Sequence, residues 1–330
     1  MKEKGFALIA VLGLLMILSL VATFIANYAE QRIEQAQQLR VRMQSQLDGD
    51  ANVATLLHII ATRPLVLNAY LLQQPATLEA DLDISPLARI SLDGVRYQGV
   101  GQSAFSLQDE GSLLSLLDPD RERWTNLFRQ QGLQPQEAER FLDQLQDYTD
   151  QDDLRRLNGA SSSDYRSQGL APPPQRLMIS PGQIFNLLDA IKLEPQLQAM
   201  LTLATTRSGQ LHNLNTMPKA VLQSIPGIDE ALAQGLIDAR QKKPFNDLSD
   251  ANARTGRIIP LDPLGIPSLA SAYVRIRIWP NAQSCRQSIW LGISSTPGSS
   301  QTPWDIDYSF AFDHDQPCPT PQQLANAPLL

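Results

Sequence analysis

Residues 5–26 read GFALIAVLGLLMILSLVATFIA. Four residues precede this stretch, and no side chain from Phe6 to Ala26 is ionisable. An α-helix needs ~20 consecutive apolar residues to cross the hydrocarbon core of a bilayer. The stretch therefore predicts a transmembrane helix, and the residues after it are interpreted as a domain attached to a membrane.

Three interpretations of this stretch compete. A secretory signal peptide has an apolar region of ~7–15 residues and a small-residue cleavage site, whereas this run is longer and residues 25–30 form a poor site. A plain membrane anchor is the alternative that hydropathy alone leaves open. The short charged leader, Gly5, Phe6 and the apolar run together resemble a type IV prepilin signal. The resemblance implies cleavage between Gly5 and Phe6 by the prepilin peptidase, with N-methylation of Phe6.

The fifth residue after that cleavage point is Ala10, where pilins and most pseudopilins carry glutamate. A carboxylate inside a membrane is costly unless it has a partner. In pilin-like filaments this partner is the N-terminal amine of a neighbouring subunit. A missing glutamate disfavours a repeating shaft subunit and resembles the K-type minor pseudopilin of type II secretion. The resemblance implies that Ala10 marks a subunit at the tip.

Composition narrows the classes of function. The formal charge is −7, from 27 basic and 34 acidic residues, which disfavours binding to nucleic acid or to an anionic membrane surface. Cys285 and Cys318 are too few for a zinc knuckle, and the sequence has no CxxC motif. In an oxidising compartment the two can form a disulfide; two unpaired buried thiols are the alternative.

Periodicity predicts an α+β fold. Apolar residues three or four apart extend the first helix to about residue 48, with Leu39 and Met43 on its apolar face. Alternating residues predict strands at 90–97, with Asp93-Gly94 as a hairpin turn, and at 99–107, 272–279, 286–292 and 306–312. Helices are predicted at 51–72, with a break at Arg63-Pro64, and at 124–129, 136–148, 181–191 and 194–205.

This order places a long N-terminal helix on a small antiparallel sheet, with a large helical domain inserted between strands, as in a pilin-like fold. The expected division is a leader over 1–5, a transmembrane and amphipathic helix over 6–48, a pilin-like domain formed by 49–108 and 270–330, and an inserted helical domain over 109–269.

The most acidic segment, residues 147–165, reads DYTDQDDLRRLNGASSSDY. Acidic side chains at alternate loop positions can direct oxygens toward a hard cation such as Ca²⁺. The segment is not an EF-hand, because it lacks the glycine and glutamate of that loop counted from Asp150 or Asp152. On composition alone, a solvated acidic loop is the preferred interpretation.

The K-type family changes this preference, because it has an acidic loop of similar pattern in its helical domain, which binds calcium. The matching residues are Asp147, Tyr148, Asp150, Asp152, Asp153, Gly159, Ala160 and Tyr165. Ser161 replaces a glutamate of that pattern, which implies a missing ligand and weaker affinity. The resemblance implies Ca²⁺ ligands at Asp150, Asp152 and Asp153, with Asp147 and Asp164 as further candidates.

Residues 211–229 read LHNLNTMPKAVLQSIPGID and resemble a helix–hairpin–helix. Thr216 is expected to cap the first helix, Pro226-Gly227 to form the turn, and Ala231 to allow close packing. In DNA-binding examples, amides of the hairpin hold a phosphate. Here Asp229 opposes an anion at that point, and the basic residues, Arg240, Lys242 and Lys243, lie only downstream. Packing is therefore the preferred role.

Catalytic motifs are missing from the sequence. The three histidines, His58, His212 and His314, lie in no HExxH motif and beside no GxSxG motif, and the sequence contains neither a P-loop nor GxGxxG. The chain is therefore not expected to be an enzyme.

The resemblance to the K-type minor pseudopilin covers nearly the whole chain. It implies a tip subunit that assembles with the I- and J-type minor pseudopilins, and further with the H type and the major pseudopilin, to initiate or cap the pseudopilus that drives export of folded proteins. It also implies one pass through the inner membrane of a Gram-negative bacterium, with the bulk of the chain in the periplasm. The alternative is a membrane-anchored periplasmic protein that binds or takes up DNA through its hairpin.

Overall fold

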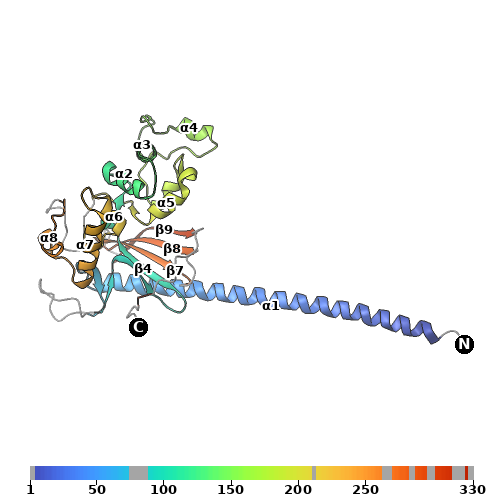
Figure 1. Ribbon diagram of the computed structural model, residues 1–330. Coiled ribbons are helices and arrows are strands. Elements are labelled where there is room, and N and C mark those ends of the chain that lie inside the picture. The colour runs from blue at the N-terminus through green and yellow to red at the C-terminus, as the bar shows by residue number, and fades with distance from the viewer. Residues whose placement is uncertain are drawn as a thin grey trace.

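The computed structural model describes residues 4–73, 88–209, 213–261, 270–281, 287–295, 302–313 and 324–325. The chain starts with helix α1, Lys4–Thr62, which extends far beyond the folded head (Figure 1). Its 59 residues give a length of about 90 Å at 1.5 Å per residue. Within the described chain, this is the one helix long and apolar enough to cross a membrane.

Helix α1 does not stop at the expected boundary. Its side chains are exposed from Leu8 almost to residue 47, and burial begins at Asp48. The helix continues through Gly49 because Leu56 and Ile59 pack onto the sheet and offset the weak helix propensity of glycine. It ends at Thr62, two residues before Pro64, as the predicted break at Arg63-Pro64 requires. Residue 48 therefore marks entry into the head, and the helix itself ends later.

The head is built on a five-stranded antiparallel sheet of order β3-β4-β7-β8-β9. These strands are β3 Asp93–Gln98, β4 Ala104–Asp109, β7 Tyr273–Trp279, β8 Gln287–Ser294 and β9 Asp305–Asp313. Central strands β4 and β7 are neighbours in the sheet although more than 160 residues separate them. The α+β fold with a domain inserted between strands is confirmed.

The predicted hairpin at Asp93-Gly94 is wrong. Strand β2, Arg89–Ser91, pairs with β1, Ala69–Leu71, in a separate two-stranded sheet. Strand β3 begins at Asp93 and pairs with β4 instead, so the true hairpin turn lies within residues 99–103. Gly94 has φ +80° next to an irregularity in the β3–β4 register. The Asp-Gly pair is therefore the site of a bulge at a strand end and not of a reversal.

The insert is mainly helical and packs around one apolar core. Its elements are η1 Glu110–Ser112, α2 Arg121–Gln130, α3 Pro135–Thr149, α4 Ser162–Ser167, η2 Pro181–Asn186, η3 Ala190–Leu193, α5 Glu194–Leu201, α6 Lys219–Ser224, α7 Glu230–Lys242 and α8 Leu248–Thr255. Strands β5, Leu114–Ser115, and β6, Ala204–Thr205, form one short parallel pair within it. The helix predicted over 181–191 is two 3₁₀ turns, because Leu187 is extended between them.

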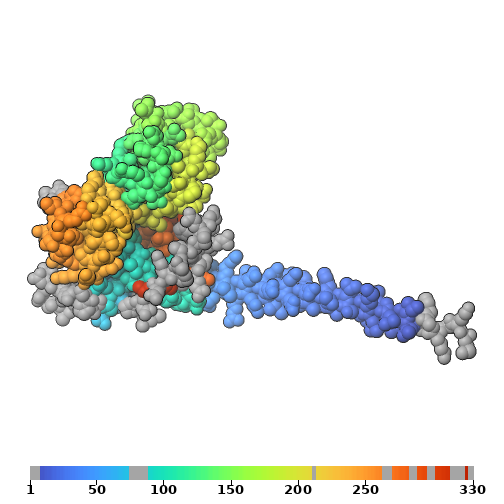
Figure 2. Space-filling view, viewed as in Figure 1, coloured from blue at the N-terminus to red at the C-terminus, as the bar shows by residue number. Residues whose placement is uncertain are grey.

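The two faces of the sheet differ in chemistry. Val274, Ile276 and Ile278 of β7 share an aliphatic core with α1. The alternate residues, among them Arg275 and Arg277, lie on the opposite face, which also carries Trp290. The insert covers part of this opposite face, and the space-filling view shows it stacked on the head while α1 projects alone (Figure 2).

Candidate functional site

The residues predicted for processing lie at the start of helix α1. Gly5, Phe6 and Ala10 lie in the first turns of α1, and Ala10 is exposed. The role of Ala10 as a marker of the tip position stays a prediction. Cys285 and Cys318 lie outside the described residues, so the disulfide stays a prediction.

The acidic segment follows α3 and divides into two groups. In the first, Asp147 is buried and accepts hydrogen bonds from the backbone amides of Arg156 and Ala160, at 3.1 and 3.0 Å. Arg156 Nη1 lies 2.6 Å from Asp147 Oδ1 and 2.6 Å from Asp150 Oδ2. The guanidinium thus joins the end of α3 to the loop. Gly159 is required here because a Cβ at this position would overlap Asp147 Oδ2.

The second group fixes the start of α4. Asp164 Oδ2 accepts from the amide of Ser161 at 2.8 Å, completing a capping box, and Asp153 Oδ1 accepts from the amide of Ser162 at 2.9 Å. These backbone hydrogen bonds lower the pKa of both carboxyl groups. Asp152 Oδ1 accepts from the amide of Leu154 at 2.9 Å, which forms a local turn.

The described part of the chain brings no three acidic, histidine or cysteine side chains together in a metal-binding arrangement. The donor chemistry nevertheless suits a hard cation at one point. Asp147 and Asp150 converge on a single cationic nitrogen, and Asp150 Oδ1 is buried without a hydrogen-bond partner. An ion at this point would compete with Arg156 for the same oxygens.

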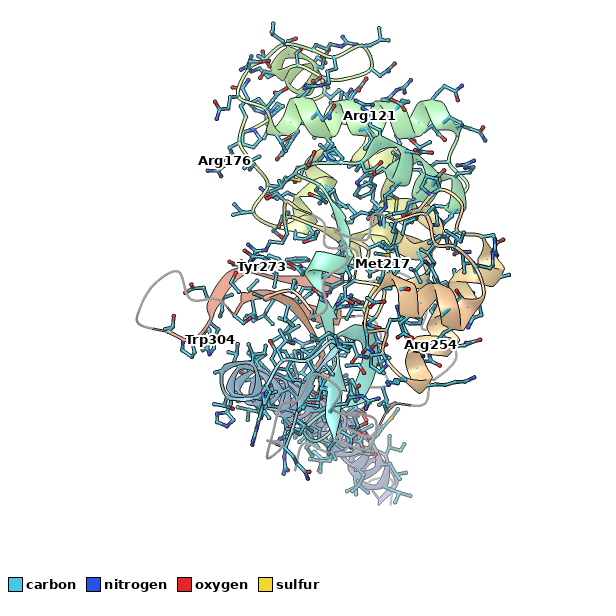
Figure 3. The ribbon with its side chains drawn as sticks, turned by 90° about the vertical axis from the view of Figure 1, so that its left-hand side faces the viewer. Arg121, Arg176, Met217, Arg254, Tyr273 and Trp304 are labelled. Carbon is cyan, nitrogen blue, oxygen red and sulfur yellow. The ribbon has the colours of Figure 1, made fainter. Side chains whose placement is uncertain are left out.

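The hairpin motif acts as a packing unit in this structure. Thr216 does not cap α6, because the N-cap of this helix is Pro218. The hydroxyl of Thr216 instead donates to Asp109 Oδ2 at 2.9 Å. Asn215 donates to the carbonyl of Phe245 at 2.9 Å and accepts from its amide at 2.7 Å. Met217 lies near the middle of the molecule, where the insert meets the sheet (Figure 3). The asparagine-threonine pattern therefore ties the hairpin to its surroundings.

The turn of the hairpin is built as predicted, but its surroundings disfavour a phosphate. Gly227 has φ +85°, and Asp229 caps α7 and lies 2.9 Å from Arg257 Nη1. Arg240 is buried and donates to the carbonyls of residues 214 and 217. Ala231 is exposed, contrary to prediction, and Ala233 is the buried small residue. The prediction for Ala231 is wrong because α7 begins at Glu230, and Ala233, not Ala231, lies on the face of the helix that packs into the core of the insert.

Asp109 is an important residue that the sequence interpretation missed. It ends β4, and its buried carboxylate accepts from Thr216, Asn213, Gly111 and Ser271. Burial raises its pKa despite these hydrogen bonds. An aspartate two residues after the strand predicted at 99–107 was the available signal. Its partners Asn213, Thr216 and Ser271, however, lie more than 100 residues away in the sequence.

A buried ion pair lies beside this junction. Arg275 Nη2 is 2.8 Å from Glu110 Oε1, and both side chains are almost completely inaccessible. Tyr308 donates its hydroxyl to the same Glu110 oxygen. Arg275 also donates to the carbonyl of Ala204 at the insert. Such a network is costly to break, because loss of one partner leaves a buried charge.

Two of the comparisons with known proteins give matches. Residues 115–237 match the family described as type II secretion system protein K. A chain from the crystal structure of the GspK–GspI–GspJ complex of the type 2 secretion system of enterotoxigenic Escherichia coli is similar in structure, with a TM-score of 0.52 and 14% sequence identity. The match covers 86% of this chain and 100% of that chain, and at this identity it shows a shared fold. No curated protein sequence matches the chain.

Proposed function

We propose that the chain is a K-type protein of type II secretion and that it is the minor pseudopilin at the tip of the pseudopilus, because residues 115–237 match the family described as type II secretion system protein K. The matched family is a component of a secretion system and not a family of enzymes. The long apolar helix fits a single-pass membrane anchor in such a protein.

The observation that carries this proposal is the surface of α1. Between the membrane stretch and the head, Ile33, Leu39 and Met43 are each more than half exposed. An amphipathic helix is stable in water when its apolar face is covered, and no part of the described chain covers this one. Neighbouring helices of other pilin-like subunits would supply that cover. The insert, held away from α1 by the sheet, adds bulk that suits a terminal position better than a repeating one.

We propose that the I- and J-type minor pseudopilins are its direct partners, with the H type and the major pseudopilin further along the fibre. Support comes from the similarity to a chain of a three-protein complex. The bulk of the chain would then lie in the periplasm, and the fibre would initiate there and drive the export of folded proteins.

Co-purification tests the proposal. The full chain, expressed with the other prepilin-like proteins of its own secretion system and with the prepilin peptidase, is expected to bring down two of them in detergent. Its N-terminus is expected to be N-methylated Phe6. A monomeric chain with Met1 intact would contradict the proposal. DNA retardation by the purified chain, lost on Gly227→Asp, would favour the DNA-binding alternative.

We also propose that the acidic loop binds Ca²⁺, with Asp147 and Asp150 as the first ligands and Asp152, Asp153 and Asp164 as further ones. The unpartnered oxygen of Asp150 supports this proposal. Bound Ca²⁺ would screen the carboxylates and hold the loop closed. The melting temperature is expected to rise with excess Ca²⁺ relative to chelator in the wild type, but not in Asp150→Ala/Asp152→Ala.

The control for this experiment is Asp238→Ala, which removes an exposed carboxylate from α7. This variant is expected to keep the full calcium response. An unchanged melting temperature in the wild type would mean that Arg156 alone neutralises the loop.

A further inference from the structure

Arginine and tryptophan side chains alternate on the sheet face that is turned toward the insert. Arg277 pairs across the sheet with Ser106 on one side and with Trp290 on the other. Its Cζ lies 4.5 Å from the ring centroid of Trp290 and 4.7 Å from that of Trp279. Arg96 Cζ lies 3.8 Å from the ring of the same Trp279. Arg277 is therefore held in place by two indole rings, without needing a hydrogen bond to fix it.

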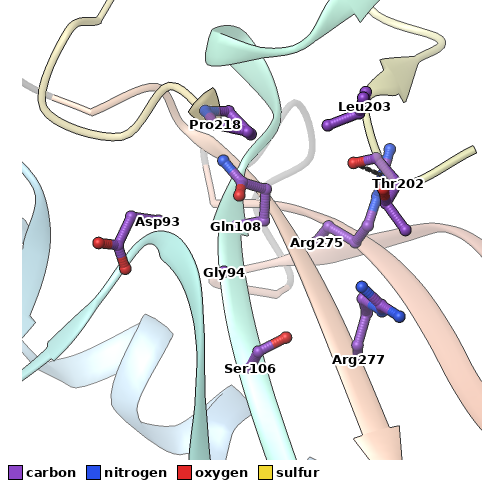
Figure 4. A pocket seen from close by; sticks show the side chains of 9 residues that line it. All are labelled: Asp93, Gly94, Ser106, Gln108, Thr202, Leu203, Pro218, Arg275 and Arg277. Carbon is purple, nitrogen blue, oxygen red and sulfur yellow. Dashed lines mark hydrogen bonds between the residues drawn. The ribbon is translucent and has the colours of Figure 1, made fainter. Parts of the chain in front are cut away.

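A cavity of about 170 Å³ opens beside Arg277, between the sheet and the insert (Figure 4). Strands β3, β4 and β7 form its floor, and residues that precede β6 and α6 form its other wall. Its lining is Asp93, Gly94, Ser106, Gln108, Thr202, Leu203, Pro218, Arg275 and Arg277. The cavity is large enough for a small ion with some of its water. Its lining includes charged and polar side chains, although the greater part of its exposed surface is apolar.

The charges around the cavity are unbalanced. Arg275 is neutralised by Glu110 at 2.8 Å. Arg277 forms no ion pair within the described part of the chain, and its Nε is buried without a hydrogen-bond partner. Asp93 points away from both arginines (Figure 4). Among the residues that the structure describes, the positive charge of Arg277 is therefore left without a counter-charge at the edge of the cavity.

The pKa of Arg277 supports this picture. Loss of water around the guanidinium is the main cause that lowers it to about 9, and the positive charges of Arg275 and Arg96 lower it further. A desolvated guanidinium next to like charges is unfavourable unless an anion joins it.

We propose that this cavity binds a carboxylate anion through Arg277. A carboxylate matches the planar fork of a guanidinium, which can donate two parallel hydrogen bonds to it. The hydroxyl of Ser106 lines the same cavity and can donate a third. A monovalent anion balances the single unpaired charge, whereas a divalent anion would leave a negative excess close to Asp93. The carboxylate can come from a small free acid or from a glutamate side chain of a neighbouring protein.

The experiment uses the full chain in detergent micelles at pH 7. Its melting temperature is measured in sodium acetate and in sodium chloride of equal ionic strength. At a concentration ten times Kd, acetate is expected to raise the melting temperature by a few degrees. Arg277→Met keeps an unbranched stem between the indole rings and removes the unpaired positive charge, so it is expected to fold at least as well as the wild type. It is also expected to lose the acetate response.

Arg96→Met is the matched control, because Arg96 stacks on the same tryptophan but does not line the cavity. It is expected to keep the acetate response. A capped tripeptide with a central glutamate separates the two sources: a response to acetate alone indicates a small acid, and a response to both indicates a protein side chain. No response in the wild type, an equal response in Arg277→Met, or a response to sulfate but not to acetate would overturn the assignment.

Discussion

At the scale of single residues, Asp109 joins three segments that are distant in sequence. Its Oδ2 accepts from Thr216 and Asn213 of the insert, and its Oδ1 accepts from Ser271, where the chain returns to the sheet. The carboxylate therefore holds both connections between the insert and the head. A neutral amide cannot accept from all of these donors, because one of its two positions is itself a donor.

We expect Asp109→Asn to reduce the free energy of unfolding by about 2–3 kcal/mol, since at least one buried donor loses its acceptor. Denaturant titration of the full chain in detergent would measure the loss. Asp238→Asn, which changes an exposed carboxylate on α7, is expected to stay within about 0.5 kcal/mol of the wild type. Equal stability of the two variants would contradict a structural role for Asp109.

The carboxylates at the start of α4 predict a dependence on pH. Backbone amides of Ser162 and Ser161 lower the pKa of Asp153 and Asp164, respectively, below the usual value. A lowered pKa contributes stability that is complete above the unfolded value, near 3.8, and is lost as the pH falls through the folded value. The loop over 150–165 is therefore expected to open in acid before the rest of the insert.

Hydrogen exchange of amides in this loop, measured at pH 5 and at pH 3, would test the prediction. Protection corrected for intrinsic rates should fall at pH 3. Asp153→Asn/Asp164→Asn should show low protection at both values. Unchanged protection of the wild type at pH 3 would mean that the two carboxylates do not hold the loop.

At the scale of elements, the hairpin of α6 and α7 contains two glycines with opposite requirements. Gly227 lies in the turn at φ +85°, and an added Cβ would come within 3.2 Å of Pro260. Gly235 lies inside α7, with nothing within 4 Å of an added Cβ. Gly227 is needed for its left-handed backbone conformation, whereas Gly235 weakens the helix in which it lies.

We expect Gly227→Ala to destabilise the insert by about 1–2 kcal/mol, because alanine pays for the left-handed conformation. The same substitution at Gly235 is expected to stabilise α7 by about 0.5–1 kcal/mol, because alanine is the better helix former. Thermal unfolding is expected to show a lower melting temperature for Gly227→Ala and a higher one for Gly235→Ala than for the wild type. A change of melting temperature in the same direction for both variants would contradict this assignment of the turn.

Elements with a local signal could be predicted from the sequence. The apolar run, the alternation in β7, β8 and β9 and the amphipathic pattern of α3 each depend on neighbours a few residues apart. The hairpin at Asp93-Gly94 failed because a turn sequence cannot say which strand β3 will choose as its partner. Long-range pairing with β4 decided the outcome.

In the candidate sites, too, features with a local sequence pattern could be predicted, whereas contacts between distant residues could not. The acidic loop was found by composition, but the sequence did not reveal that Arg156 lies between Asp147 and Asp150. Thr216 was recognised as important and given the wrong role, because its partner Asp109 is 107 residues away. Arg277 gave no signal at all, since its setting is created by two tryptophans on different strands.

At the scale of the whole molecule, α1 is a helix of about 90 Å of which only the last quarter packs on the head. Its exposed length includes an apolar face beyond the membrane stretch, with Leu39 and Met43 at 60% and 65% exposure. An assembly through packed helices would bury this face, whereas the fold of the single chain does not use it. Substitutions on this face are therefore expected to impair assembly with other subunits without changing the stability of the single chain.

We expect Leu39→Arg/Met43→Arg to abolish co-purification with the proposed I- and J-type partners and to leave the melting temperature of the isolated chain within about 1 °C. Gln31→Arg/Gln38→Arg adds the same charge to the opposite face of the helix, and this control is expected to keep the partners. The two variants differ in the face that they alter and not in charge or helix propensity. If both double variants lost the partners, a general effect of added charge on α1 would explain the result. If neither variant lost them, the helices would not pack through this face, and the contacts of the proposed tip complex would have to lie on the sheet or the insert.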